Sequence, residues 1–106
     1  MTAIDDFASR ARAVRGILPR SSQFGSHPPA WWFGSREIAH AHRGHLEVRL
    51  TRAVMARMRD ELARDARVDY RRPGSDWVRL QLRTADDVEL AMRLLRMAKK
   101  ANSPAS

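Results

Sequence analysis

The stretch EIAHAHRGHLEVRL, residues 37–50, decides the fold predicted for this chain of 106 residues. From residue 45 onward, polar and apolar residues alternate strictly, which is typical of a β-strand with one buried face. Arg43-Gly44 suits a two-residue type I′ turn, because glycine readily takes the second position of that turn. The stretch is therefore predicted to form a β-hairpin.

The turn sets the register of this hairpin. It pairs His42 with His45 and His40 with Glu47, and alternation along the strands places these four residues on one face. The face predicted for the core holds Ala39, Ala41, Leu46, Val48 and Leu50. The opposite face holds His40, His42, His45, Glu47 and Arg49, whereas Glu37 is expected to point toward the core side near the sheet edge.

On the N-terminal side of the hairpin, the sequence predicts a helix and a loop. Residues 2–18, TAIDDFASRARAVRGIL, repeat apolar residues at spacings of three and four, which predicts an amphipathic helix that ends near Gly16 and Pro19. Residues 19–29 are rich in Pro, Gly and Ser, and a loop is predicted there.

The next four residues, AWWF at positions 30–33, favour a strand that precedes the hairpin. A turn at Gly34-Ser35 would pair this strand with the hairpin and set Trp31 opposite Ile38. In this register Trp31 lies on the histidine side of the sheet.

On the C-terminal side, a second helix is predicted over residues 52–66, with Thr51 as its N-cap. A short strand at 67–70 and an alternating strand at 77–83 follow, and the latter carries Trp77 on the face opposite its apolar residues. A last helix is predicted over residues 85–101, opened by the capping pair of Thr84 and Asp87.

The predicted element order is α-β-β-β-α-β-β-α. This order favours an α+β fold, with a small antiparallel sheet of about five strands covered on one face by helices. Residues 1–101 are predicted to form a single domain and residues 102–106 a disordered tail. The residues predicted for the core include Phe7, Val14, Val48, Leu50, Met58, Leu62, Leu80 and Leu95.

The composition excludes several classes of site. The chain has no cysteine, so disulfides, zinc–thiolate sites and thiol catalysis are excluded. No apolar run approaches the ~20 residues of a membrane span, and the N-terminus lacks the apolar segment of a signal peptide. We therefore expect a cytoplasmic protein that does not act at a membrane.

The chain is strongly basic, with a formal net charge of +8. A basic domain of this size favours nucleic acid or another phosphate-bearing partner, because phosphate contacts supply most non-specific affinity. The alternative is a genomic arginine bias, since eighteen arginines accompany only two lysines.

Three segments resemble the small bacterial proteins of the luciferase-domain family. They are Gly34-Ser35-Arg36-Glu37-Ile38-Ala39-His40-Ala41-His42, Leu46-Glu47-Val48-Arg49-Leu50 and Ser75-Asp76-Trp77-Val78, and the resemblance covers roughly residues 27–101. It implies a small α+β module, because the chain is too short for a flavin barrel or a luciferin-adenylating enzyme. The element order also resembles the MmcQ/YjbR-type fold, which is associated with DNA binding.

The histidine face is the predicted binding site. We expect a non-enzymatic binding module without a cofactor, whose ligand is anionic: a phosphate-bearing small molecule or nucleic acid. The predicted ligand-binding residues are Arg36, His40, His42, His45, Arg49 and Trp77.

Other interpretations of the same residues stay open. A metal-dependent enzyme would use His40, His42, His45 and Glu47 as metal ligands, although Arg36 and Arg49 on the same face would repel a divalent cation. A protein-interaction subunit would use exposed tryptophans. The histidines could also simply fill a solvated sheet face. The sequence contains no P-loop or dinucleotide-binding motif.

Overall fold

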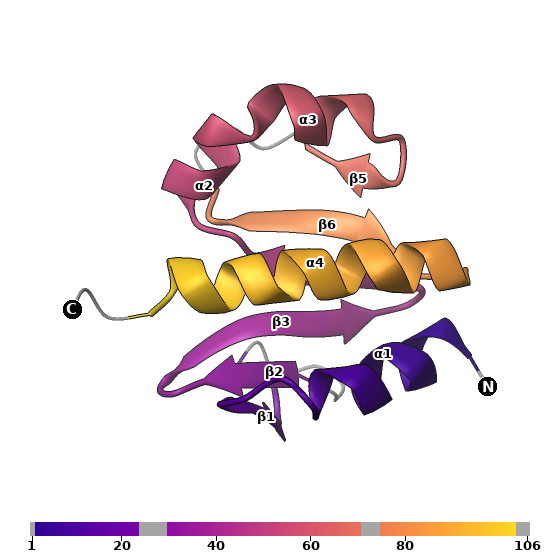
Figure 1. The fold of residues 1–106 in the computed structure, drawn as a ribbon, viewed down its shortest axis with the longest axis vertical. Coiled ribbons are helices and arrows are strands. Elements are labelled where there is room, and N and C mark those ends of the chain that lie inside the picture. The colour runs from indigo at the N-terminus through magenta and orange to yellow at the C-terminus, as the bar shows by residue number, and fades with distance from the viewer. Residues whose placement is uncertain (1, 24–29, 71–74, 104–106) are drawn as a thin grey trace.

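The predicted hairpin lies inside a six-stranded antiparallel sheet in the computed structural model, which describes residues 2–23, 30–70 and 75–103. The strands follow the order β1-β2-β3-β4-β6-β5 (Figure 1). In chain order the elements are α1 (Ala3–Ala11), β1 (Ile17–Arg20), β2 (Ala30–Phe33), β3 (Arg36–His42), β4 (His45–Arg49), α2 (Arg52–Arg57), α3 (Arg59–Arg64), β5 (Val68–Asp69), β6 (Trp77–Gln81) and α4 (Ala85–Ala101).

The β3–β4 hairpin has the predicted turn and register. His42 pairs with His45 and His40 with Glu47. The turn residues Arg43-Gly44 have φ values of 44° and 79°, and positive φ at both positions is what a type I′ turn requires. Local spacing alone was therefore enough to predict this element correctly.

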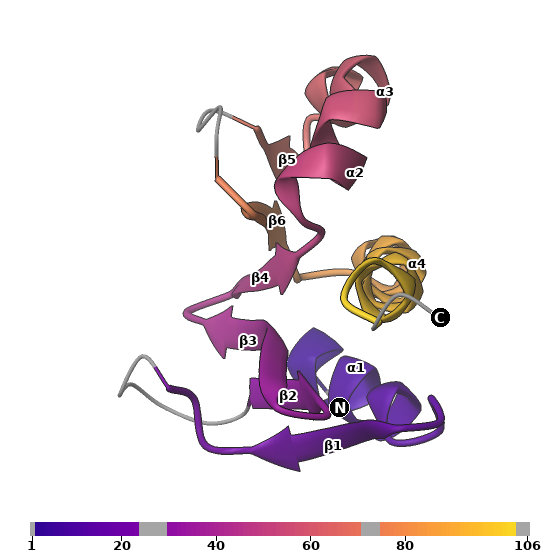
Figure 2. The same ribbon diagram turned by 90° about the vertical axis from the view of Figure 1, so that its left-hand side faces the viewer.

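The helices all lie on one side of the sheet, as the edge-on view in Figure 2 shows. α4 packs against β3, β4 and β6, and α1 packs against α4. Burial alternates along β4 and β6, so one face of each strand lies in the core and the other does not. The α+β fold with helices on one face of an antiparallel sheet is thus confirmed.

The buried core matches the prediction at most positions. Phe7, Val48, Leu50, Leu62, Leu80 and Leu95 are buried, whereas Val14 and Met58 are only partly buried. None of the described helices is long and apolar enough to cross a membrane.

The first helix ends earlier than its apolar spacing predicts. α1 stops at Ala11, and Gly16 then takes a left-handed φ of 85°, which reverses the chain. The following residues, including Pro19, form β1, which pairs with β2 and adds a sixth strand to the five that were predicted. Leu18 consequently lies on an edge strand with 54% of its surface exposed.

The predicted second helix is divided into two short helices. α2 and α3 are separated at Met58, whose φ of −102° and ψ of 12° depart from helical values. Thr51 is the N-cap of α2, as predicted, and its hydroxyl accepts a hydrogen bond from the amide of Val54. The predicted strand at 67–70 is present as β5, with only two residues.

A β-bulge changes the pairing of β2 with β3. Trp32 pairs with Glu37, but Trp31 pairs with Ala39, so Ile38 is the extra residue. Trp31 therefore faces the helices, where it is 1% exposed and packs edge-on against the ring of Phe7, with 4.8 Å between the ring centroids. The expectation that Trp31 lies opposite Ile38 on the histidine face is wrong.

The C-terminal helix begins and ends with capping interactions. Thr84 and Asp87 form the predicted capping box at its N-terminus. Asn102 is its C-cap, is 8% exposed, and donates hydrogen bonds from Nδ2 to the carbonyls of Arg49 and Ala98. Asn102, the first residue of the predicted tail, is thus bonded to α4 and to β4, and residues 104–106 of that tail lie outside the described residues.

Candidate functional site

The side of the sheet away from the helices carries most of the predicted site, and we call it the open face. Alternation on the paired strands β4 and β6 turns His45, Glu47, Arg49, Trp77, Arg79 and Gln81 toward this face. β3 adds the side chain of His40, which pairs with Glu47. The open face is therefore a dense polar surface with one large aromatic side chain.

At the centre of the open face, His40 lies between two carboxylates. Its Nδ1 is 2.8 Å from Glu37 Oε2, and its Nε2 is 2.8 Å from Glu47 Oε2. An imidazole can donate to both carboxylates only when both ring nitrogens carry protons. We call Glu37, His40 and Glu47 the carboxylate–histidine cluster.

Glu37 belongs to this cluster because of the β-bulge. The extra residue Ile38 reverses the alternation on β3, so Glu37 turns to the same face as His40. Its carboxylate is held by Ser22 Oγ at 2.9 Å and by the amide of Gln23 at 2.7 Å. The prediction that Glu37 points toward the core side is therefore wrong, although its side chain is fully buried.

Glu47 forms the outer end of the cluster. Partial burial raises the pKa of the Glu47 carboxyl, but the hydrogen bond and charge of His40, together with Arg79, outweigh it and leave the pKa below its usual value. Arg79 Nη2 lies 3.3 Å from Glu47 Oε1. The ring of Trp77 lies beside His40, with 5.0 Å between ring centroids and a tilt of 43°.

Arg49 is held by the segment that precedes β6. Its Nη2 donates to Asp76 Oδ2 at 3.3 Å, and the other oxygen of Asp76 accepts a hydrogen bond from the amide of Arg52 at 2.9 Å. Ser75 Oγ accepts a bond from the amide of Trp77 at 3.0 Å, as expected for a local turn. The carboxylate of Asp76 thus joins β6 to the start of α2, rather than bonding only to its own turn.

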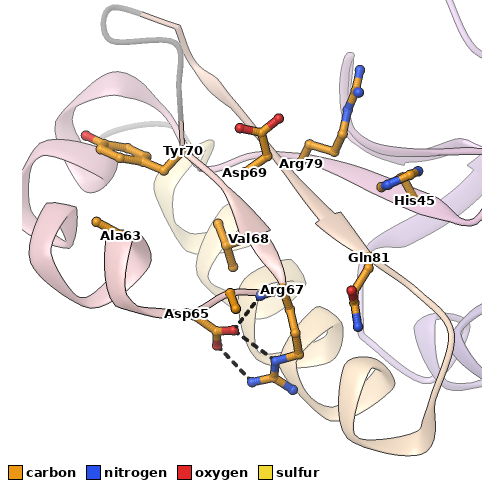
Figure 3. A pocket seen from close by; sticks show the side chains of 10 residues that line it. His45, Ala63, Asp65, Arg67, Val68, Asp69, Tyr70, Arg79 and Gln81 are labelled. Atoms are coloured by element: carbon orange, nitrogen blue, oxygen red, sulfur yellow. Dashed lines mark hydrogen bonds and ion pairs between the residues drawn. The ribbon is translucent and has the colours of Figure 1, made fainter.

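Next to the cluster, β4, β5, β6 and the end of α3 line an open hollow of about 510 Å³ (Figure 3). It is lined by His45, Ala63, Asp65, Ala66, Arg67, Val68, Asp69, Tyr70, Arg79 and Gln81. Arg67 donates to both oxygens of Asp65, at 2.9 and 2.8 Å, and these bonds keep the pKa of Asp65 below its usual value. In Figure 3, Arg79 and His45 lie on the other side of the hollow from Asp65 and Arg67.

The predicted ligand-binding residues are divided between several places. His45 lines the hollow, and Trp77 lines a smaller one together with Glu47 and Arg79. His42 is exposed at the end of β3. Arg36 is not on the open face, because the β-bulge turns its side chain to the opposite face of β3 from that of His40. Arg36 instead lines another hollow, beside the end of α4.

The residues of the metal alternative do not form a ligand set. Within residues 2–23, 30–70 and 75–103, no group of three or more His, Asp or Glu side chains is arranged to hold a metal ion. Both ring nitrogens of His40 face carboxylate oxygens, and Nδ1 of His45 lies 3.2 Å from the carbonyl of Arg43.

On the open face, Glu37, Arg79 and Gln81 were not among the residues predicted for the site, and neither were the residues 63–70 that line the hollow. The alternation that placed Trp77 on the open face also places Arg79 and Gln81 there, so the sequence contained that signal. For Glu37 the pattern pointed to the wrong face, because nothing in the spacing of β2 and β3 indicates a bulge.

Comparisons with known proteins identify the family. A family model described as the luciferase domain matches residues 35–98, which include the β3–β4 hairpin, β6 and most of α4. Searches of curated proteins and of solved structures each found no match. The likeness of the element order to the MmcQ/YjbR-type fold therefore stays a prediction. Because the family match spans well over half of the sequence, this chain belongs to the luciferase-domain family.

Proposed function

We propose that this luciferase-domain protein is a module that binds a small molecule with an anionic group, such as a phosphate, in the hollow between β4, β5 and β6. The observation that carries the proposal is that His45 and Arg79 both line this hollow. Arginine and protonated histidine are the donors that most often hold phosphate and carboxylate groups. The volume of about 510 Å³ falls within the range of small-molecule sites, roughly 300–1,000 Å³.

The charge of the hollow depends on His45. Arg67 and Arg79 are matched by Asp65 and Asp69 among the lining residues, so the hollow is balanced when His45 is neutral. Protonation of His45 adds one positive charge and one hydrogen-bond donor for an anion. The protonated form of His45 is therefore the form that favours an anion in the hollow.

The carboxylate–histidine cluster supports binding in preference to metal-dependent chemistry. A metal ion would need a free ring nitrogen of His40, but both nitrogens lie 2.8 Å from carboxylate oxygens. The cluster instead fixes Glu47, which lies 3.3 Å from Arg79 and so orients that guanidinium beside the hollow. In this proposal the cluster is a support for the binding residues.

Nucleic acid is the second class of ligand that the net charge of +8 favours. A nucleic acid would contact many basic residues at once, so its binding would weaken steeply with salt. With about four phosphate contacts, the slope of log K against log salt would be roughly −3.6. A small phosphate ester held in one hollow would show a much shallower dependence.

The proposal can be tested by titrating the protein with a nucleoside monophosphate and with a short oligonucleotide, using calorimetry and NMR. Arg79→Gln is expected to weaken nucleotide binding by about tenfold, since it removes a charged hydrogen bond. His45→Gln is expected to weaken nucleotide binding as well, since it removes a side chain that can carry a positive charge. His42→Gln and Arg57→Gln, two exposed positions outside the hollow, are the matched controls and keep wild-type binding.

Two results would contradict the proposal. One is the absence of saturable nucleotide binding at any pH between 5 and 8. The other is binding that Arg79→Gln and His45→Gln leave unchanged while the folded spectrum is retained. If only the oligonucleotide bound, and its binding weakened steeply with salt, the partner would be nucleic acid and not a small molecule.

A further inference from the structure

Gln81 lies in the hollow beside β5, next to both residues that are proposed to hold the anion. His45 is its pairing partner on β4, and Arg79 precedes it by two residues on β6. Burial alternates along both strands, so the three side chains leave the sheet on the open face. All three line the hollow (Figure 3). They therefore belong to one continuous surface.

The main chain and the side chain of Gln81 are both anchored to other parts of the fold. Its main-chain amide donates a hydrogen bond to the carbonyl of Arg67 at 2.9 Å, in the segment before β5. Its side-chain Nε2 donates to Oδ1 and Oδ2 of Asp87 at 3.2 and 3.3 Å. The amide group at the end of the side chain is therefore held in place.

Asp87 decides which end of this amide group it receives. Its carboxylate is 1% exposed, and Oδ2 also accepts hydrogen bonds from the amides of Arg83 and Thr84, at 2.8 and 3.0 Å. Burial raises the pKa of Asp87, but these hydrogen bonds outweigh burial and leave the pKa below its usual value, so the carboxyl group is ionised at neutral pH. An ionised carboxylate only accepts hydrogen bonds, so it takes the NH₂ end of Gln81 and not Oε1.

Oε1 of Gln81 is the polar atom that this arrangement leaves to a ligand. It accepts no hydrogen bond from any residue in the described part of the chain. Side chains that pair across two strands, or that lie two residues apart on one strand, leave the sheet about 5–7 Å apart. An acceptor is thus placed beside His45 and Arg79 at roughly the span of a three-carbon phosphate ester.

The charges around Gln81 favour a neutral donor. Arg67 lines the same hollow, and its Nη1 lies 3.9 Å from Oδ1 of Asp87. The carboxylate that anchors Gln81 therefore already has a cation beside it. An ammonium group approaching Oε1 would be repelled by Arg67, whereas a hydroxyl group would need no counter-charge.

We propose that Gln81 selects anions that carry a hydroxyl group, so that the preferred ligand of the hollow is a hydroxylated phosphate ester. The inference rests on the function proposed above: Arg79 and His45 hold the phosphate, and the hydroxyl donates to Gln81 Oε1. Asp87 is a positioning residue, because it acts on the ligand only through the Nε2 end of Gln81. An anion without a hydroxyl leaves Oε1 to water and loses this hydrogen bond.

Glycerol phosphate and propyl phosphate are the matched probes, since they have the same three carbons and the same phosphate and differ in the hydroxyl groups. Calorimetry at neutral pH is expected to show that glycerol phosphate binds about fivefold more tightly, as one neutral hydrogen bond allows. Gln81→Met keeps the length of the side chain and removes its amide, so it is expected to abolish this preference without weakening propyl phosphate. Gln23→Met, at an exposed position outside the hollow, is the matched control and keeps the preference.

Asp87→Asn tests the positioning role separately, because a neutral amide at residue 87 can either donate to Gln81 or accept from it. Most of the preference for glycerol phosphate should be lost, while propyl phosphate binds as before and the NMR spectrum stays that of the folded chain. Equal weakening of both probes would show that Asp87 has a merely structural role. A preference that survives in Gln81→Met, or its absence in the wild-type chain, would overturn the selection by Gln81 alone. If neither probe binds, the function proposed above fails as well.

Discussion

Glu37 is a buried carboxylate, 1% exposed, and its environment explains how a charge is tolerated there. Removing an ion from water costs several kcal/mol unless its oxygens receive hydrogen bonds. Oε1 accepts from the amide of Gln23, and Oε2 accepts from Ser22 Oγ and faces Nδ1 of His40. Of these three partners only His40 can carry a positive charge, so the stability of this site depends on that histidine.

We therefore predict that His40→Ala lowers the free energy of unfolding by about 1–3 kcal/mol, because it removes a hydrogen-bond partner of the buried carboxyl group of Glu37. Urea denaturation at neutral pH measures the change. His42→Ala, two residues along the same strand but exposed, is the matched control and should change stability by no more than about 0.5 kcal/mol. If both variants changed the free energy of unfolding by equally small amounts, the hydrogen bonds from Ser22 and Gln23 alone would be enough for the buried carboxyl group of Glu37.

The pairing of His40 with Glu47 could be predicted from the sequence, but the position of Glu37 could not. The two-residue turn fixes which residues of β3 and β4 face each other, and this depends only on local spacing. Whether Ile38 is an extra residue opposite Trp31 depends on the packing of that indole against Phe7, which involves the distant helix α1. A change of one residue in that pairing moved Glu37 and Arg36 to faces other than those expected.

At the scale of elements, the β3–β4 turn contains a residue that is poorly suited to its backbone. Arg43 has a φ of 44°, a left-handed conformation that costs a residue with a Cβ roughly 1–2 kcal/mol. Asparagine tolerates this conformation better than arginine does and is preferred at the first position of type I′ turns. Gly44, with a φ of 79°, already has the residue preferred at the second position.

Arg43→Asn is accordingly expected to raise the free energy of unfolding by about 0.5–1 kcal/mol, without changing the denaturant slope. Gly44→Ala is the opposite test in the same turn and should lower it by about 1 kcal/mol or more, because alanine is strained at this φ. Both changes are read from the midpoint of urea unfolding. If Arg43→Asn were neutral or destabilising, the Arg43 side chain would have to make a compensating contact.

Elements that depend on local signals were predicted well, and elements that depend on distant pairing were not. Thr84 and Asp87 define the start of α4 through a capping box, so this boundary was predicted from four residues. The apolar spacing of α1 continues through Leu18, yet residues 17–20 pair with β2 instead. Helix propensity is a weak preference, and a sheet edge that offers backbone hydrogen bonds outweighs it here.

For the whole molecule, the net charge of +8 conceals a set of carboxylates that are tightly held in the folded state. Burial raises the pKa of Asp87, but hydrogen bonds from the amides of Arg83 and Thr84 outweigh it and leave the pKa below its usual value. The hydrogen bonds from Arg67 lower the pKa of Asp65. The pKa of Glu47 is also lowered, because His40 and Arg79 outweigh the effect of burial. These groups lie on α4, at the hollow beside β5 and in the carboxylate–histidine cluster, so acid weakens several parts of the fold at once.

The protein should lose stability in acid because all three of these pKa values are lowered. A carboxyl group whose pKa is lower in the folded state binds protons more readily after unfolding, so its stabilising effect is present above the ordinary pKa and is lost as the pH falls. The ordinary values are 4.5 for Glu47 and 3.8 for Asp87, so stability should begin to fall near pH 5 and continue to fall through pH 3. The slope approaches about 1.4 kcal/mol per pH unit for each additional proton that the unfolded chain binds. Urea unfolding measured between pH 7 and pH 3 tests this.

Asp87→Asn separates one carboxylate from the rest, because it removes the charge that caps α4. It should lower stability by about 1 kcal/mol at neutral pH, as the loss of a cap does, and should make the acid limb shallower. Asp60→Asn, at an exposed position of α3, is the matched control and should keep the wild-type profile. If stability were constant from pH 7 to pH 3, or if Asp87→Asn left the slope unchanged, the carboxylates would not hold the fold as described. Protonation of the carboxylates also raises the positive charge of a chain that is already at +8, and the self-repulsion of the folded state grows with it. An acid-stable protein would contradict both this repulsion and the lowered pKa values.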